Sequence, residues 1–139
     1  MNLITVEFQS NGTSGSILPY SFSDKNKALS RYYTVLSSAV ISEVYKCGAI
    51  IFDNFGRLYG QEGFLHGEET SRNVWFVVEF QSNGETGSVN AFSYSSNDEA
   101  QAKYHQLLSV AAVSSVPYHG AVCFDDDGLS FEIKTYEHI

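Results

Sequence analysis

Residues 78–88 of this 139-residue chain read Val78-Glu-Phe-Gln-Ser-Asn-Gly-Glu-Thr-Gly-Ser88. The same segment occurs once before, as Val6-Glu-Phe-Gln-Ser-Asn-Gly-Thr-Ser-Gly-Ser16, and the displacement between the two copies then stays constant without a gap. The further matched pairs are Ala28 and Ala100, Tyr32 and Tyr104, Gly48 and Gly120, Phe52 and Phe124, Gly56 and Gly128, and His66 and His138. Self-similarity at one fixed period indicates tandem structural units. The sequence therefore predicts a first repeat at 1–66, a polar linker at 67–74 and a second repeat at 75–139.

Each repeat has roughly 64 residues, which is near the lower limit for a domain that folds alone. A unit of this size usually buries one face against another body, and the nearest candidate is the other copy. We therefore expect one pseudo-twofold body. The sequence leaves open whether the two sheets join edge to edge or pack face to face.

The apolar pattern within one repeat predicts the order ββαββ. Residues 3–10 alternate, with Ile4, Val6 and Phe8 on one side, which is typical of a strand. An Asn-Gly loop and a returning strand at 16–23 complete a hairpin. Apolar residues at spacings of three and four then predict a helix, and a second hairpin closes the unit. The fold class is α+β, with each helix packed on an antiparallel sheet.

Several local signals set the expected boundaries. Ser96-Asn-Asp-Glu99 is a capping-box pattern for the start of the second helix. The helices should end near Ser42 and before Pro117, because the residue before proline leaves the helical region. Strands are expected at 48–53, 57–65 and 129–136, and hairpin turns at 53–56 and 125–128.

The overall charge is −8, and the excess of acidic residues lies almost wholly in residues 75–139. An acidic balance repels phosphate backbones and anionic membranes, so nucleic-acid binding through a basic footprint and membrane association are disfavoured. No signal peptide or apolar span is visible, and the two cysteines do not form a disulfide framework. These features predict a cytoplasmic protein.

The segment 104–122 contains the pattern Leu-Ser-x-Ala-Ala-Val-Ser-Ser-Val-Pro-x-His-x-Ala-Val. It resembles small uncharacterised proteins of phages and prophages of Gram-positive bacteria, which typically hold a single copy of the unit. The resemblance covers 75–138, and it reaches 3–66 only through the internal repeat, because Val44-Tyr-Lys-Cys-Gly departs from the pattern at three positions. It implies a viral setting in an infected or lysogenic bacterium, and it implies no activity. If single-copy relatives pair, this chain would be a covalent version of their dimer.

Five residues are candidates for binding a ligand or partner: His119, Tyr118, Tyr104, Cys47 and Tyr32. His119 lies where the second helix should meet a strand, and Cys47 takes its place in the first copy. A histidine there could act as an acid or base, or it could form a structural hydrogen bond. Tyr32 and Tyr104 lie on the predicted helices, where tyrosines could line a groove between the copies.

No catalytic or metal-binding motif is present. The chain lacks Cys-x-x-Cys and His-x-x-x-His spacings, and Asp125-Asp-Asp-Gly128 does not fit a calcium loop. We expect no cofactor and no metal. The equivalent His66 and His138 either help to pair the two units or belong to exposed strand ends.

These observations favour a non-enzymatic binding protein that occupies a host protein or holds a small ligand in a cleft between the copies, in a counter-defence role. The first alternative is a virion assembly or accessory protein that associates through sheet edges or helix faces, and a homo-oligomer is compatible with either. The second alternative is a small enzyme that uses His119 with a nearby carboxylate. That hypothesis requires the pair to face a pocket.

Overall fold

The computed structural model describes residues 1–69, 73–128 and 131–139. The first repeat consists of β1 (Leu3–Ser10), β2 (Gly15–Phe22), α1 (Lys25–Ala39), β3 (Lys46–Asp53) and β4 (Leu58–Leu65). The second repeat consists of β5 (Trp75–Ser82), β6 (Gly87–Tyr94), α2 (Asn97–Ala112), β7 (Tyr118–Asp125) and β8 (Phe131–Glu137). The predicted ββαββ order is confirmed in both copies, although residues 129 and 130 of the last predicted strand lie outside the described residues.

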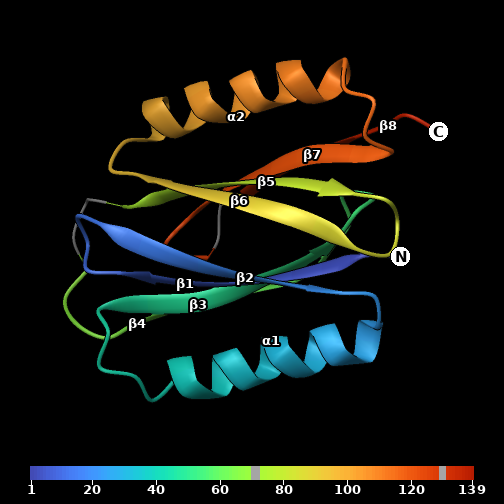
Figure 1. Cartoon of the computed structure of the whole chain (residues 1–139). Helices are drawn as coiled ribbons and strands as arrows, with labels where there is room; N and C mark the ends of the chain where they lie inside the picture. Colours follow the sequence, from blue (N-terminus) through green and yellow to red (C-terminus); the bar gives the residue numbers. More distant parts are fainter. Residues whose placement is uncertain (70–72, 129–130) are drawn as a thin grey trace.

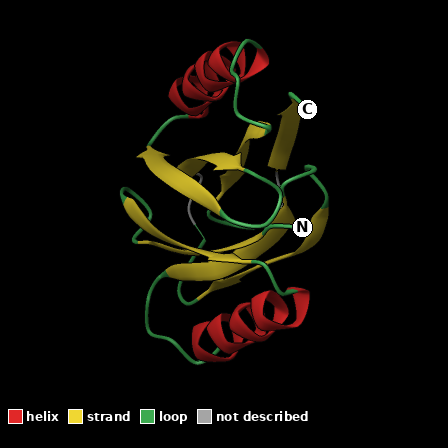
Figure 2. Cartoon of the chain, turned by 45° about the vertical axis from the view of Figure 1, so that its right-hand side comes forward, coloured by secondary structure: helices red, strands yellow, loops and turns green. Residues whose placement is uncertain are grey.

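Two antiparallel sheets form the centre of the molecule. Their strand orders are β2-β1-β3-β4 and β6-β5-β7-β8, so the two repeats have the same topology. The sheets stack on each other, and α1 and α2 cover the two outer faces (Figures 1 and 2). The predicted α+β fold and pseudo-twofold body are therefore confirmed. Of the two arrangements that the sequence left open, the sheets adopt the face-to-face one.

An apolar core fills the space between the sheets. In β1 the alternation predicted from the sequence holds, because Ile4, Val6 and Phe8 point toward the other repeat. The buried members of this core are Ile4, Val6, Phe8, Ile50, Phe52, Val74, Phe76, Val78, Phe80, Val122 and Phe124. Phe8 contacts Phe124 with ring centroids 5.5 Å apart, and the symmetry-equivalent pair of Phe52 and Phe80 lies 5.3 Å apart. Equal contacts on both sides of the axis identify a pseudo-twofold interface.

The opposite face of each sheet carries its own helix. Ala28, Tyr32 and Leu36 of α1 pack against the first sheet, and equivalent residues of α2 pack against the second. Ser96 caps α2 as predicted, because its Oγ accepts a hydrogen bond from the Glu99 N–H at 3.2 Å. Both helices end earlier than the sequence predicted, at Ala39 and Ala112.

The second hairpin of each repeat depends on two kinds of glycine. Gly56 and Gly128 have φ angles of +83° and +69° in the predicted turns, a region that L-residues rarely adopt. Gly48 lies on β3 against the Phe8 ring and the backbone of β4, where an added Cβ would collide with the Glu62 carbonyl. Close packing therefore accounts for Gly48 and its equivalent, Gly120.

The repeats also meet through a buried ion cluster, between the start of β3 and the turn after β7. Lys46 Nζ lies 3.2 Å from Asp126 Oδ1 and 2.7 Å from Asp127 Oδ1, and only 1% of the lysine side chain is exposed. Asp126 Oδ2 accepts hydrogen bonds from Ser10 Oγ at 2.8 Å and from the Val74 N–H at 3.0 Å. Burial lowers the pKa of Lys46, but the hydrogen bonds and charges of Asp127 and Asp126 outweigh it and raise the pKa. The lysine is therefore charged at neutral pH.

The equivalent position at the other end has different chemistry. Tyr118 stands in place of Lys46, and its ring meets Phe55 edge-on at 5.2 Å. Asn54 replaces Asp126, and its Oδ1 accepts a hydrogen bond from the Asn2 N–H at 2.7 Å. The backbone positions at the two ends are thus related by the pseudo-twofold axis, but the residue types at those positions differ. Within the described residues, neither helix has the length and apolar character of a membrane span.

Because the inter-sheet core is shared, we expect both repeats to unfold in one cooperative transition. Truncation of Phe124 to alanine should lower the free energy of unfolding by about 3–5 kcal/mol, since it leaves a cavity at the centre of that core. Urea unfolding followed by fluorescence and by circular dichroism measures both effects. The control Val113→Ala, at a side chain that is 86% exposed, should change the free energy by less than about 0.5 kcal/mol. Two separate transitions in the wild type would contradict the shared core.

Candidate functional site

The five candidate residues from the sequence are not brought together. His119 and Tyr104 lie between the second sheet and α2, whereas Cys47 and Tyr32 lie between the first sheet and α1. Tyr118 points the other way, toward Phe55 in the first repeat. The helix tyrosines therefore do not line a cleft between the repeats, because the helices are outside and the phenylalanine core fills the space between the sheets.

His119 does pair with a carboxylate. Its Nε2 lies 2.9 Å from Glu79 Oε2, and Glu79 Oε1 accepts a second hydrogen bond from Asn90 Nδ2 at 3.1 Å. The three side chains come from β7, β5 and β6. Only 3% of His119 is exposed, so the pair joins three strands and does not present an acid or base to a substrate. The structural interpretation of His119 fits this geometry better than the catalytic one.

The helix tyrosines Tyr32 and Tyr104 are also buried residues that pack within their own repeat. The Tyr32 ring lies on Gly60, where an added Cβ would stand 2.8 Å from the hydroxyl oxygen. Burial, with smaller effects of Glu62 and Tyr33, raises the pKa of Tyr32 to about 12. Burial, with a smaller effect of Glu132, likewise raises the pKa of Tyr104 to about 12.

The equivalent histidines at the strand ends have one shared role. His66 Nε2 lies 2.8 Å from the Ala39 carbonyl oxygen, and His138 Nε2 lies 2.7 Å from the Ala111 carbonyl oxygen. Each imidazole thus donates to a carbonyl at the C-terminal end of the helix in its own repeat, where carbonyls lack helical partners. Their recurrence reflects helix capping, and neither histidine pairs the two units.

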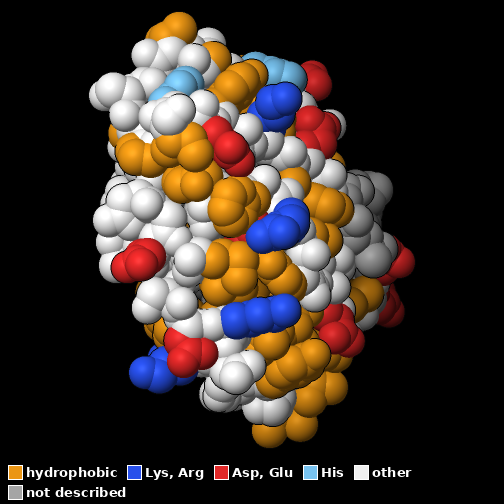
Figure 3. Space-filling view, turned by 90° about the vertical axis from the view of Figure 1, so that its right-hand side faces the viewer, with side chains coloured by type: hydrophobic (Ala, Val, Ile, Leu, Met, Phe, Trp, Pro, Cys, Tyr) orange, Lys and Arg blue, Asp and Glu red, His pale blue; other side chains and the backbone are white. Residues whose placement is uncertain are grey.

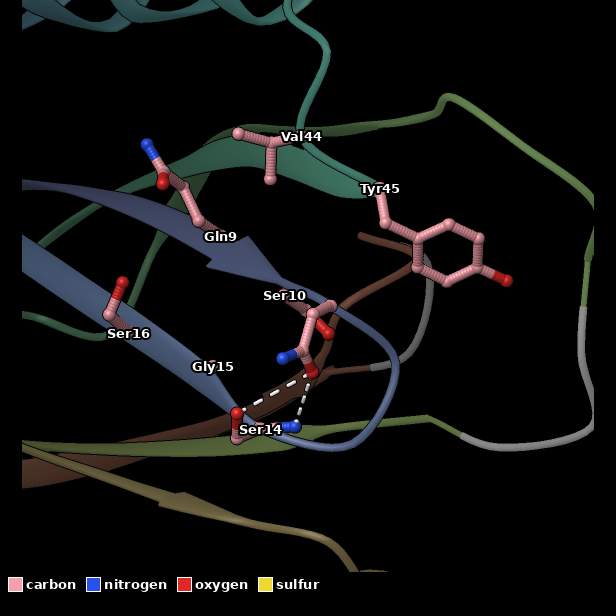
Figure 4. Close-up of a pocket in the computed structure, with 8 residues that line it drawn as sticks. Gln9, Ser10, Ser14, Gly15, Ser16, Val44 and Tyr45 are labelled. Atoms are coloured by element: carbon pink, nitrogen blue, oxygen red, sulfur yellow. Dashed lines mark hydrogen bonds between the residues drawn. The ribbon is translucent and has the colours of Figure 1, made fainter.

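The first repeat has a polar groove on the outer face of its sheet, beside the end of α1. Its largest part is a hollow of about 400 Å³, shown in Figure 4. Gln9 and Ser16 lie on neighbouring strands there, and Val44 and Tyr45 stand across from them (Figure 4). Two further hollows, of about 230 Å³ and about 50 Å³, share Gln9 with the first and Glu7 with each other. We call these three neighbouring hollows together the β1–β2 groove.

Glu7 is the only charged side chain among the described residues that line the β1–β2 groove. Its carboxylate has no hydrogen-bond or ion-pair partner among the residues that the structure describes. The equivalent Glu79 has two partners, His119 and Asn90, and the first repeat has Cys47 and Leu18 at those positions. The same carboxylate is thus satisfied in one repeat and left open in the other.

Cys47 does not replace the missing imidazole. It is 4% exposed, and its Sγ lies 3.4 Å from the Ala39 carbonyl oxygen. Burial raises the pKa of the Cys47 thiol, the Ser42 hydrogen bond lowers it, and the Glu7 charge raises it again. The net rise keeps Cys47 protonated at neutral pH, which argues against a nucleophilic role.

Sequence inspection alone missed Glu7, Gln9 and Tyr45. The signal in the sequence was a difference between the copies. Both copies have the glutamate, but only the second has the histidine and the asparagine that pair with it. Recognising it requires the register of three neighbouring strands, which places Gln9 opposite Cys47 and Glu7 opposite both Leu18 and Ala49.

A second candidate surface lies at the opposite end of the molecule. Figure 3 shows hydrophobic side chains gathered in a band on this end, with lysine and arginine side chains across it. We define the aromatic end patch as Met1, Lys25, Phe55, Arg57, Tyr59 and Tyr118. Asp53 is fully buried beneath it and accepts hydrogen bonds from Arg57 Nε at 2.8 Å and Tyr59 Oη at 2.6 Å. These bonds hold the two side chains in place, while Phe55 remains 41% exposed.

Comparison of the chain with protein-family models, with curated proteins and with solved structures finds no match. The geometry of the described residues is therefore the basis for proposing a function.

The buried tyrosines and Cys123 predict a loss of stability in base. Burial, followed by the charges of Glu132 and Asp125, raises the pKa of Cys123 from 9.0 to about 12. Each group releases its proton more readily in the unfolded chain, so its contribution is complete below the unfolded pKa and is lost as pH rises through the folded pKa. The free energy of unfolding should therefore fall between about pH 9 and pH 12.

Urea unfolding at a series of pH values measures this fall. The variants Tyr32→Phe and Tyr104→Phe should each make it shallower, because phenylalanine has no proton to release. A profile that is unchanged in both variants would show that these hydroxyls do not titrate as their burial requires.

Proposed function

We propose that the protein is a non-enzymatic binding protein that holds a small ligand in the β1–β2 groove. The observation that carries the proposal is the difference between the repeats at one position on the same fold. The second repeat satisfies Glu79 with its own side chains, whereas the first leaves Glu7 open at the wall of a hollow. Glu7 is only partly buried and its carboxylate has no protein partner among the described residues, so a molecule that binds in the groove and pairs with it would stabilise the first repeat.

The lining supports binding in preference to catalysis. Glu7 lines the two smaller hollows, and the largest hollow presents amides, hydroxyls, Val44 and the Tyr45 ring. Most of this lining is polar and can hydrogen-bond a polar small molecule, and Val44 and Tyr45 add apolar contact area. The Cys47 thiol stays protonated, and His119 lies under the other helix, so neither supplies a nucleophile or base to the groove.

The resemblance of 104–122 to small phage and prophage proteins supports a setting in the cytoplasm of an infected or lysogenic bacterium. In that setting, a protein that binds a ligand without converting it would act by lowering the free concentration of the ligand. If a bacterial defence system depends on that ligand, sequestration would be counter-defence.

Equilibrium dialysis against a small-molecule extract of bacterial cells, followed by mass spectrometry, tests the proposal. Ser16 is exposed on the groove wall, so Ser16→Trp should block it and abolish retention of any compound that the wild type holds. The matched control is Ser88→Trp, at the equivalent exposed position of the second repeat, which should retain the compound. If the wild type retains nothing that Ser16→Trp loses, the proposal is wrong.

The aromatic end patch supports a second candidate function, the binding of a host protein. Exposed aromatic rings beside arginine are the side chains that most often anchor protein interfaces. Hydrogen bonds to the buried Asp53 hold Arg57 and Tyr59 of the patch in place before any partner binds.

Crosslinking in bacterial lysate, with the partner identified by mass spectrometry, tests the second function. The variant Phe55→Ser should lose a partner that contacts the aromatic end patch. The control Ile41→Ser changes an 82% exposed apolar side chain at the other end of the molecule and should keep the partner. Equal recovery with both variants would exclude this patch as the contact surface.

A further inference from the structure

We infer that the β1–β2 groove selects a small organic cation whose planar N–H donor group occupies, beside Glu7, the place that the His119 imidazole holds beside Glu79. The inference rests on the proposed function and specifies the chemical class of its ligand. It uses the second repeat as an internal template for the first.

The two carboxylates occupy equivalent positions in the two repeats. Glu79 and His119 lie on the face of the second sheet that α2 covers, on strands β5 and β7. Glu7 and Cys47 lie at the same register on β1 and β3, under α1. A cysteine side chain is shorter than a histidine side chain, and the hollow of about 50 Å³ is lined by both Glu7 and Cys47. That volume holds several water molecules, so it is accessible to a compact polar group.

Electrostatics favours a cation in this hollow. Glu7 is the acidic side chain of this hollow, and Ser38, Ala39 and Ser42 bring the C-terminal end of α1 to the same wall. The carbonyl end of a helix carries partial negative charge, and α1 has no basic residue in its last turn. The thiol of Cys47 is neutral, so no protein cation among the described lining residues balances Glu7. An imidazolium or guanidinium group would form a charge-assisted hydrogen bond there.

The lining of the largest hollow indicates the chemistry of the rest of the ligand. This hollow opens from the shared Gln9, whose exposed side chain has no hydrogen-bond partner within the described part of the chain. Ser16 contributes a hydroxyl, and Tyr45 lies at the far side of the hollow from it (Figure 4). Apart from Glu7 the groove lining is uncharged, so the body attached to the cationic group should be neutral and polar.

Imidazole itself is the probe that tests the inference. Titration of the isotope-labelled full-length protein with imidazolium, followed by amide chemical shifts, should move the signals of residues around Glu7 and Cys47. Glu7→Gln should weaken the interaction at least about tenfold, the loss expected when a charge-assisted hydrogen bond becomes a neutral one. Cys47→His should also abolish it, because the protein then supplies its own imidazole.

The reverse substitution gives a gain of binding. His119→Cys opens the equivalent space beside Glu79, so imidazolium should raise the melting temperature of this variant more than that of the wild type. The neutral five-membered ring cyclopentanol should produce neither effect. Shifts that are equal in the wild type and Glu7→Gln, together with no selective stabilisation of His119→Cys, would overturn the inference.

The two levels of the proposal fail differently. One outcome is that imidazolium binding proves independent of Glu7 while the wild type retains a neutral cell compound that Ser16→Trp loses. In that case the ligand class is wrong and the binding function stands. If neither imidazolium nor any cell compound depends on the groove, both are wrong.

Discussion

The structure depends on the contact between the inner faces of the two sheets. The central strands are buried on both sides, and every residue of β3 is buried. One face of each sheet is covered by the helix of its own repeat, and the other face can be covered only by a second apolar surface. Burial of phenylalanine side chains is worth roughly 1.5–3 kcal/mol each, and five of them lie between the sheets. The duplication therefore supplies the second half of a core that one repeat would leave exposed.

A covalent pair of repeats can diverge in ways that a symmetric dimer cannot. In a twofold dimer each contact appears twice, so an added lysine would need a carboxylate at both ends. Here Lys46 meets Asp126 and Asp127 at one end, while Tyr118 meets Phe55 at the other. Since a buried charge without its partner is strongly unfavourable, these contacts also determine which surfaces fit. A second copy of the first repeat would offer Lys46 an asparagine and a phenylalanine in place of two carboxylates.

The elements of the fold could be predicted from the sequence because their signals are local. Alternation identified β1, the Ser96 capping pattern identified the start of α2, and the glycine turns identified the hairpins. The stacking of the sheets could not be predicted, since it depends on which apolar face pairs with which partner. The prediction that Tyr32 and Tyr104 line a groove between the repeats was wrong for the same reason. Their helical stripe shows that they are buried, but it does not show whether the helix lies between the repeats or outside them.

The candidate site illustrates a further limit. His119 was singled out because of its residue type, yet the informative position is its cysteine counterpart, Cys47. In the second repeat the imidazole and an amide both hydrogen-bond one carboxylate across three strands, so the partners of Glu79 come from the protein itself. In the first repeat two of the three groups are replaced and the carboxylate remains, next to the carbonyl end of a helix. The Glu7 carboxylate is partly exposed at the wall of the hollow, so water or a ligand can satisfy it there. The duplication allows this opening, because the core that supports Glu7 is completed by the other repeat and does not require the missing imidazole.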